Sequence, residues 1–266
     1  MFSIVIPLYN KEQSVTNTLQ SVLNQTFTEF EVVIINDGST DRSVEVVEGF
    51  NDPRIRLIHQ KNQGVSAARN KGIKEANYEW ICFLDADDLW RENHLSTLRN
   101  MIETYPEYKA FCNSFIRSSE EINQNNEIVF KVIDDYFKEG LKSFFFWTSV
   151  VCIHKTVFDV VGVFNVKLTR GEDLELWMKI GKEFTVVKSN IITAIYNQES
   201  ENKLMNNKGV PIDKCLESHL NFNDCSGFER TYLKMLAINK IKSLFKTFRC
   251  NDAFYLLYKY NINLFK

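Results

Sequence analysis

The chain is poor in the residues that punctuate loops: its 266 residues include only 10 Gly and 4 Pro. That scarcity excludes collagen-like and low-complexity proteins, and a content of 44% hydrophobic and 25% charged residues excludes a disordered chain. Long apolar runs are lacking too, because the longest, residues 144–153, is about half the roughly 20 residues that a membrane-spanning helix needs. We therefore expect a globular protein without a transmembrane segment.

Paired cysteines are also lacking. The six cysteines show neither a C-x-x-C pair nor regular spacing, so reduced thiols in a cytoplasmic protein are expected. The first residues, Met1 to Pro7, have none of the basic start, apolar run and small-residue cleavage site of a signal peptide. The four histidines have no metal-like spacing and are interpreted as structural or surface residues.

Charge is unevenly distributed, although the formal net charge is only −2. Eight Lys or Arg face one Asp between residues 230 and 266, whereas the rest of the chain carries 24 basic and 33 acidic residues. A basic tail on an acidic body favours an anionic surface as a partner, and no nucleic acid is expected.

The same tail has a helical stripe of apolar residues with basic residues beside it. Such a helix could lie in the interface of an anionic membrane, or its stripe could pack on the main domain while the lysines face water. The stripe consists of Leu233, Ala237, Ile241, Leu244, Phe245 and Phe248, and the basic residues are Lys234, Lys242, Lys246 and Arg249.

The first hundred residues alternate between strand and helix patterns. This alternation with short links predicts an α/β fold with a mainly parallel, doubly wound sheet, and the order becomes mixed after Trp90. The predicted strands are 3–8, 30–35, 55–59, 80–84, 109–116, 128–132, 184–187 and 191–195, and the predicted helices are 12–23, 41–50, 66–76, 93–105, 172–181 and much of the last forty residues.

Polar side chains follow the predicted strands, at the edge where open α/β sheets bind ligands. Pro7-Leu8-Tyr9-Asn10 and Asn36-Asp37-Gly38-Ser39 supply an aromatic face, an amide and a carboxylate, which suit stacking on a base and accepting its ring N–H. Asp85-Ala86-Asp87-Asp88 places three carboxylates at the end of an apolar strand, where uncompensated charges repel each other. A divalent cation with oxygen ligands would remove that repulsion.

Each motif alone also has an ordinary structural interpretation. Asp37-Gly38-Ser39 is typical of a turn with a helix cap, and Tyr9 could simply cover the sheet edge. The aspartates at 85–88 could end a strand and cap a helix, and Glu172 and Asp173 could be first-turn acids stabilised by a helix dipole. Their ordered occurrence at successive strand ends favours a binding site.

These motifs, with Ser3 to Asn10, Gly64 to Asn70 and Gly171-Glu172-Asp173, resemble those of the family 2 glycosyltransferases of the GT-A fold, in particular the bacterial surface-polysaccharide type. The resemblance covers roughly residues 1–195. It implies a GT-A domain over residues 1–215, with a donor half at about 1–105 and an acceptor half at about 106–215. A helical basic tail, 216–266, would follow.

The resemblance implies an inverting, metal-dependent hexosyltransferase. It would move a sugar from a nucleoside-diphosphate sugar, in first place a UDP-sugar, to a hydroxyl of a glycan or lipid-linked glycan. A metal would stabilise the charge on the leaving diphosphate, and a carboxylate would take the acceptor's proton. The implied roles are base binding by Pro7, Tyr9 and Asp37, donor contacts from Asn62 and Arg69, a ribose contact from Asp85, Mn²⁺ or Mg²⁺ binding by Asp87, and general-base catalysis by Asp173 beside Glu172.

The chain departs from this pattern near Tyr196 to Ser200, where many relatives carry a basic or histidine-containing motif. Its contact to the leaving diphosphate is absent here or comes from a lysine such as Lys203 or Lys208. The resemblance also favours the tail's peripheral contact with the inner face of the plasma membrane, because such enzymes often use lipid-linked acceptors.

Two other functions stay open. A nucleotidyltransferase that makes sugar nucleotides usually has a Gly-rich basic loop after its first strand, and Pro7-Leu8-Tyr9-Asn10 is not one. A non-catalytic sugar-nucleotide-binding protein is opposed only by Asp87 and Asp173, and a transfer or hydrolysis assay separates it from an enzyme.

Overall fold

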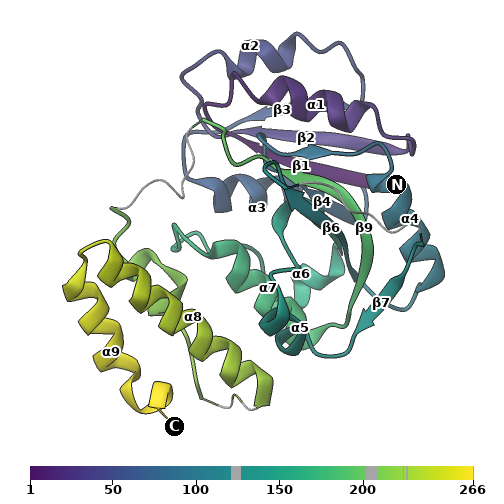
Figure 1. The fold of residues 1–266 in the computed structure, drawn as a ribbon. Helices are drawn as coiled ribbons and strands as arrows, with labels where there is room; N and C mark the ends of the chain where they lie inside the picture. The colour runs from purple at the N-terminus through teal and green to yellow at the C-terminus, as the bar shows by residue number, and fades with distance from the viewer. Residues whose placement is uncertain (121–126, 202–208, 224, 226, 266) are drawn as a thin grey trace.

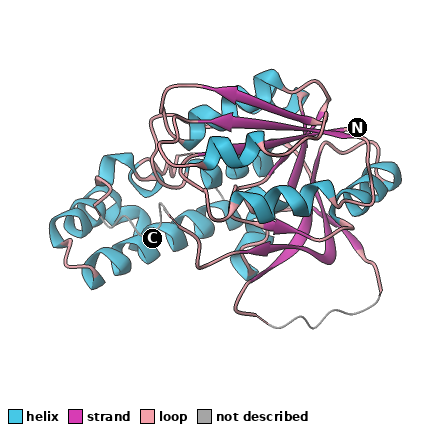
Figure 2. Ribbon diagram, turned by 90° about the horizontal axis from the view of Figure 1, so that it is seen from above, coloured by secondary structure: helices cyan, strands magenta, loops and turns pink. Residues whose placement is uncertain are grey.

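A computed structural model describes residues 1–120, 127–201, 209–223, 225 and 227–265. A nine-stranded sheet forms the centre of the molecule, with helices on both of its faces and a helical hairpin beside it (Figure 1; Figure 2). The strand order is β3-β2-β1-β4-β8-β6-β9-β5, and β7 pairs with β9. No helix in these ranges is long and apolar enough to cross a bilayer.

The first half of the sheet is parallel, as the alternation of patterns predicts. Its central strands are buried along nearly their whole length, because helices cover both faces of the sheet. The strands are β1 (Phe2–Leu8), β2 (Phe30–Asn36), β3 (Ile55–His59) and β4 (Trp80–Phe83), and the helices are α1 (Val15–Leu23), α2 (Ser43–Glu48) and α3 (Val65–Glu75).

The second half of the sheet is mixed, as expected. The strand β8 (Val151–His154) runs antiparallel to both of its neighbours, β4 and β6 (Ala110–Arg117). The strand β9 (Val186–Tyr196) lies parallel to β6 and antiparallel to β5 (Leu89–Trp90) and β7 (Phe130–Ile133). The prediction of two strands at 184–187 and 191–195 is therefore wrong: one continuous strand curves over this half (Figure 1).

Shorter elements pack against β6 and β9 or against one another. They are α4 (His94–Thr104), α5 (Tyr136–Lys142), α6 (Thr156–Val161), α7 (Glu172–Glu183) and the 3-10 turns η1 (Thr148–Val150), η3 (Ile212–Lys214) and η4 (Leu216–Ser218). The Phe-rich segment contributes η1 and β8, and its rings pack into the main core around Trp177. All six cysteines are free thiols, and four of them are buried.

The basic tail forms a hairpin of α8 (Gly227–Lys246) and α9 (Cys250–Phe265). Four residues of the predicted stripe, Leu233, Ala237, Ile241 and Leu244, are buried in a cluster with α9, with Leu168 of the main domain and with Leu216 of η4. These four therefore face protein, as in the second of the two alternatives for the stripe, in which it packs on the main domain. Only Phe245 and Phe248 face solvent, with 40% and 91% of their surface exposed.

Candidate functional site

The carboxyl ends of β1, β2 and β4 lie side by side. The Asp37 N–H donates to the Leu8 carbonyl at 2.8 Å, and the Leu84 N–H donates to the Val5 carbonyl at 3.1 Å. These contacts bring Tyr9, Asp37 and Asp85 to one edge of the sheet, although they are far apart in the sequence.

Asp37 is a buried carboxylate held by three donors. Its Oδ1 accepts from Gln60 Nε2 at 2.7 Å and from the Gln63 N–H at 2.9 Å, and its Oδ2 accepts from the Gly64 N–H at 2.8 Å. Because both oxygens are fixed, the carboxylate presents a rigid acceptor at the sheet edge. Protein contacts thus hold this carboxylate at the sheet edge, and its role in base binding stays a prediction.

Residues of the neighbouring loops lie near Asp37 at this edge. Tyr9 is 43% exposed, and Pro7, two residues earlier in the chain, is half-buried. Gly38 has φ +75°, and a Cβ there would approach the Asn62 backbone nitrogen to 3.0 Å, so glycine lets the two loops meet. The exposed Asn62 consequently borders the turn that carries Asp37.

Arg69 joins the sheet edge after β4 to the start of α7. Its Nη2 lies 2.7 Å from Asp85 Oδ1, and its Nη1 lies 3.0 Å from Glu172 Oε1, a partner 103 positions later. The guanidinium is buried, and burial alone would disfavour its charge, so the two carboxylates stabilise it. The structure places Arg69 between two site carboxylates, and its predicted contact with the donor stays a prediction.

Glu172 and Asp173 begin α7 after Gly171, which has φ +80° and lies so close to Leu216 that a Cβ would approach it to 2.7 Å. Burial and the neighbouring Asp173 raise the pKa of Glu172 to about 7, although Arg69 opposes the shift. Asp173 is half-buried, and its Oδ2 accepts from Thr148 Oγ1 at 3.3 Å. Glu172 is therefore engaged by Arg69, whereas Asp173 also accepts from the Leu174 N–H at Oδ1, at 2.7 Å, and has no basic partner among the described residues' ion pairs.

Asp87 is covered by residues that the sequence did not single out. Lys11 Nζ lies 2.8 Å from Asp87 Oδ2, and the Ser200 hydroxyl also donates to that oxygen. The Lys11 ammonium donates in addition to the Glu201 carbonyl, so the segment after β9 lies against the aspartates. No sequence spacing marks Lys11, a lone lysine after Asn10, as a site residue. Lys203 and Lys208, which the sequence offered as contacts to the leaving diphosphate, lie outside the described residues.

Asp88 has a structural place rather than a free one. Its carboxylate accepts from Ser149 Oγ at 2.7 Å and from the Asn197 N–H at 3.1 Å, which ties the two halves of the domain together. Burial, with the charges of Asp85 and Asp87, raises the pKa of Asp88 well above its usual range. A buried, engaged carboxylate of this kind is poorly placed to bind a ligand.

The remaining aspartates suit a divalent cation that arrives with a diphosphate. Among the described residues no three His, Cys, Asp or Glu side chains form a ready-made metal site. Mg²⁺, however, is usually held by one or two carboxylates together with substrate phosphates. Asp87 already attracts the ammonium of Lys11, and Asp85 lies two positions away, so the oxygen donors present fit such an ion.

Comparison with known proteins identifies the arrangement. The family model described as "Glycosyl transferase family 2" matches residues 3–161. An uncharacterized glycosyltransferase, YibD of Escherichia coli K12, is 32% identical over 88% of this chain and 68% of its own length. WfgD of Escherichia coli, named a UDP-Glc:alpha-D-GlcNAc-diphosphoundecaprenol beta-1,3-glucosyltransferase, is 31% identical over 73% of each chain.

The fold has solved counterparts. The S. aureus TarS structure with UDP-GlcNAc superposes with a TM-score of 0.68 at 20% identity, over 89% of this chain and 65% of that one. The chain spans only 26% and 31% of the length of two Rickettsia relatives, so parts of larger relatives have no counterpart here. The mixed α/β sheet has the GT-A fold, and the chain belongs to glycosyltransferase family 2.

Proposed function

We propose that the protein transfers a sugar from a UDP-sugar to a hydroxyl of a glycan or lipid-linked glycan, with inversion, in bacterial surface-polysaccharide synthesis. One observation carries the proposal: Tyr9, Asp37 and Asp87 follow strands at one sheet edge, and Arg69 links this edge to the start of α7, where Asp173 lies. The printed names of the relatives support it, since TarS was solved with UDP-GlcNAc and WfgD is named for UDP-Glc.

In this proposal each group has a task. Tyr9 stacks on the base, Asp37 accepts its ring N–H, and Asp85 meets the ribose. Mn²⁺ or Mg²⁺, held by Asp87, would offset the charge that develops on the leaving diphosphate. Asp173 takes the proton of the acceptor hydroxyl as it attacks. A single displacement of this kind inverts the anomeric centre.

A donor panel tests the proposal. Purified protein with Mn²⁺ is incubated with UDP-, GDP- and dTDP-sugars, and nucleoside diphosphate release is followed with and without saccharide acceptors. Release from a UDP-sugar, raised by an acceptor, is expected. Pyrophosphate release from UTP and a sugar phosphate would instead indicate a nucleotidyltransferase. Tight binding without turnover across saccharide and lipid-linked acceptors would indicate a non-catalytic binding protein.

Tyr9→Ala should weaken UDP binding by about fivefold to a hundredfold, because stacking of a base on an aromatic ring contributes about 1–3 kcal/mol. Tyr9 is 43% exposed, so the substitution should leave the folded state intact. Calorimetric titration with UDP measures the effect, and Tyr258→Ala, at 85% exposure on α9, is the matched control. Equal UDP affinity in the two variants would show that Tyr9 does not stack on the base.

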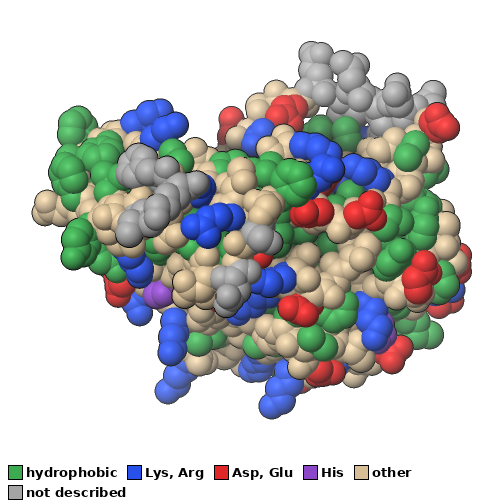
Figure 3. Space-filling view, turned by 90° about the horizontal axis from the view of Figure 1, so that it is seen from below, with side chains coloured by type: hydrophobic (Ala, Val, Ile, Leu, Met, Phe, Trp, Pro, Cys, Tyr) green, Lys and Arg blue, Asp and Glu red, His purple; other side chains and the backbone are tan. Residues whose placement is uncertain are grey.

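We also propose that the tip of the α8–α9 hairpin contacts an anionic membrane. Phe245, Phe248, Phe254 and Tyr258 are between 40% and 91% exposed there, and Lys242 and Lys246 are exposed beside them. Figure 3 shows hydrophobic side chains gathered at this end of the molecule, with basic ones nearby. Exposed rings flanked by cations suit an interface with anionic lipids.

Flotation with phosphatidylglycerol vesicles checks this contact. The wild-type chain should float at low salt and detach as salt rises, and Phe248→Ser with Phe254→Ser should float several-fold less. Val160→Ser, which alters a side chain of similar exposure (64%) on α6, should behave as wild type. A wild-type protein that stays unbound at low salt contradicts the contact.

A further inference from the structure

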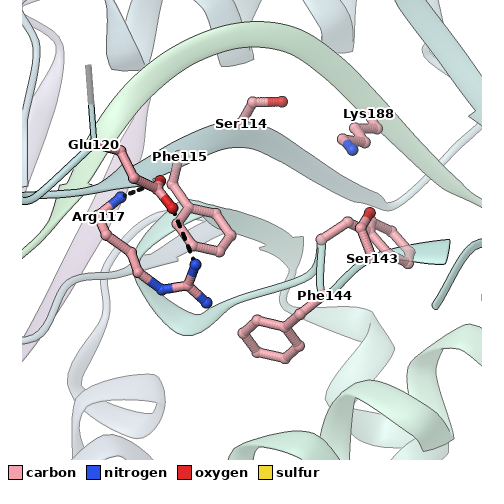
Figure 4. A pocket seen from close by; sticks show the side chains of 8 residues that line it. Ser114, Phe115, Arg117, Glu120, Ser143, Phe144 and Lys188 are labelled. Carbon is pink, nitrogen blue, oxygen red and sulfur yellow. Dashed lines mark hydrogen bonds and ion pairs between the residues drawn. The ribbon is translucent and has the colours of Figure 1, made fainter. Parts of the chain in front are cut away.

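A cavity of about 350 Å³ lies between β6, β9 and the segment that precedes η1 (Figure 4). Its lining combines aromatic rings, hydroxyls and charged groups, and its volume falls within the range of small-molecule sites. The residues that matter here are Ser114, Phe115, Arg117, Glu120, Phe144 and Lys188. None of them is among the site residues described above.

Side chains in contact with one another lead from the cavity wall to Asp173. The Phe115 ring packs on Trp147 with centroids 4.8 Å apart, and Trp147 packs on Tyr196 at 5.1 Å. Thr148, the next residue, donates to Asp173. A short chain of contacts, through Phe115, Trp147 and Thr148, therefore links the cavity to Asp173.

The cavity offers an apolar face and an excess of positive charge. Phe144 is 49% exposed, and its ring lies 6.2 Å from that of Phe115, so together they present a surface on which the C–H face of a sugar can pack. Lys188 Nζ lies 5.5 Å from the centroid of the Phe145 ring and forms no ion pair with a carboxylate of the described residues.

Arg117 supplies the second cation. Its only described carboxylate partner is Glu120, at 3.1 Å, and both side chains are about half exposed. Glu120 balances Arg117, so Lys188, five residues away along the β6–β9 pairing, is the cation left for a phosphate group.

We propose that this cavity binds the acceptor, a saccharide that carries a phosphate: the sugar ring packs on Phe115 and Phe144, and the phosphate pairs with Lys188. The proposal rests on the proposed function and names the chemical class of its acceptor. Phosphate beside the first sugar is what a saccharide linked to a lipid through phosphate would present.

The test uses hexose 1-phosphate and the neutral methyl hexoside as probes, titrated by calorimetry into the full chain with and without saturating UDP. With UDP bound, the phosphate probe should bind more tightly than the methyl hexoside. Lys188→Ala should weaken the phosphate probe about tenfold or more, as expected for a charge-assisted contact, and leave the methyl hexoside unchanged. Phe144→Ala should weaken both probes.

Lys74→Ala, which removes an exposed lysine on α3, is the charge-matched control and should bind like wild type. Equal affinity of Lys188→Ala and Lys74→Ala for hexose 1-phosphate overturns the site, as does equal binding of the two probes by the wild type. Wild-type UDP affinity in all variants shows that the fold and the proposed UDP site are intact. A wild type that binds the phosphate probe through Lys188 but never binds UDP supports the cavity and contradicts the proposed function.

Discussion

Asp87→Ala should lower the transfer rate by at least about two orders of magnitude, a typical loss when a group that stabilises transition-state charge is removed. Asp87 Oδ2 lies 2.8 Å from Lys11 Nζ, and in the proposed mechanism a metal ion held by Asp87 would stabilise the leaving diphosphate. Initial rates with the preferred UDP-sugar measure the effect. Asp134→Ala, which removes an exposed carboxylate near α5, should leave the rate unchanged.

Metal removal separates the two roles that Asp87 can have. Chelation with EDTA should abolish transfer by the wild type, and Mn²⁺ or Mg²⁺ should restore it there but not in Asp87→Ala. If Asp87 only anchored Lys11, then Lys11→Ala would reproduce the loss while the wild type kept its full rate in EDTA. That combination would exclude the metal from the mechanism.

The parallel half of the fold and its edge could be predicted from the sequence because their signals are local. Buried parallel strands are continuous apolar runs, and the turn residues that follow them mark the edge at which ligands bind. Asp37 shows the principle: its motif predicted a carboxylate at the end of the second strand, and the structure places it there.

The contacts that assemble the site could not be predicted, since they join distant segments. Arg69 meets Glu172 across 103 positions, and Lys11 meets Asp87 across 76. Neither pair has a spacing that marks a contact in a single sequence. Where α3 lies relative to α7, and Lys11 relative to Asp87, depends on the packing of the whole domain. The resemblance named Arg69 and the carboxylates but not Lys11, and only the fold shows which carboxylate each cation engages.

The apolar stripe of the tail illustrates a second limit. A helical period identifies which side chains share a face, but it does not identify what covers that face. Leu233 and Leu244 share their face with buried residues of α9, while Phe248, assigned to the same stripe, lies after the end of α8 with φ +58° and 91% exposure. The helix ends before the pattern does, so the last ring points to solvent.

Asp173→Asn should lower kcat by about 10²–10⁴-fold, the usual contribution of general-base catalysis. The amide keeps the size of the carboxylate and its contact with Thr148, but it cannot take the proton of the acceptor hydroxyl. UDP affinity should not change, because Asp173 lies at the start of α7, whereas the residues proposed to bind the base follow β1 and β2. A loss in kcat with an unchanged Kd for UDP would be a loss of chemistry.

Glu172→Gln is the matched control, since it makes the same change one residue away. Glu172 is buried against Arg69, and its raised pKa reflects that burial, so the amide should weaken the Arg69 contact and lower stability. Its kcat should fall less than that of Asp173→Asn, because Arg69 and not the acceptor is its partner. Single-turnover rates at saturating donor, with urea denaturation of both variants, measure the difference. If Glu172→Gln lost more turnover than Asp173→Asn while remaining folded, the general base would be Glu172, and Arg69 would be the group that orients it.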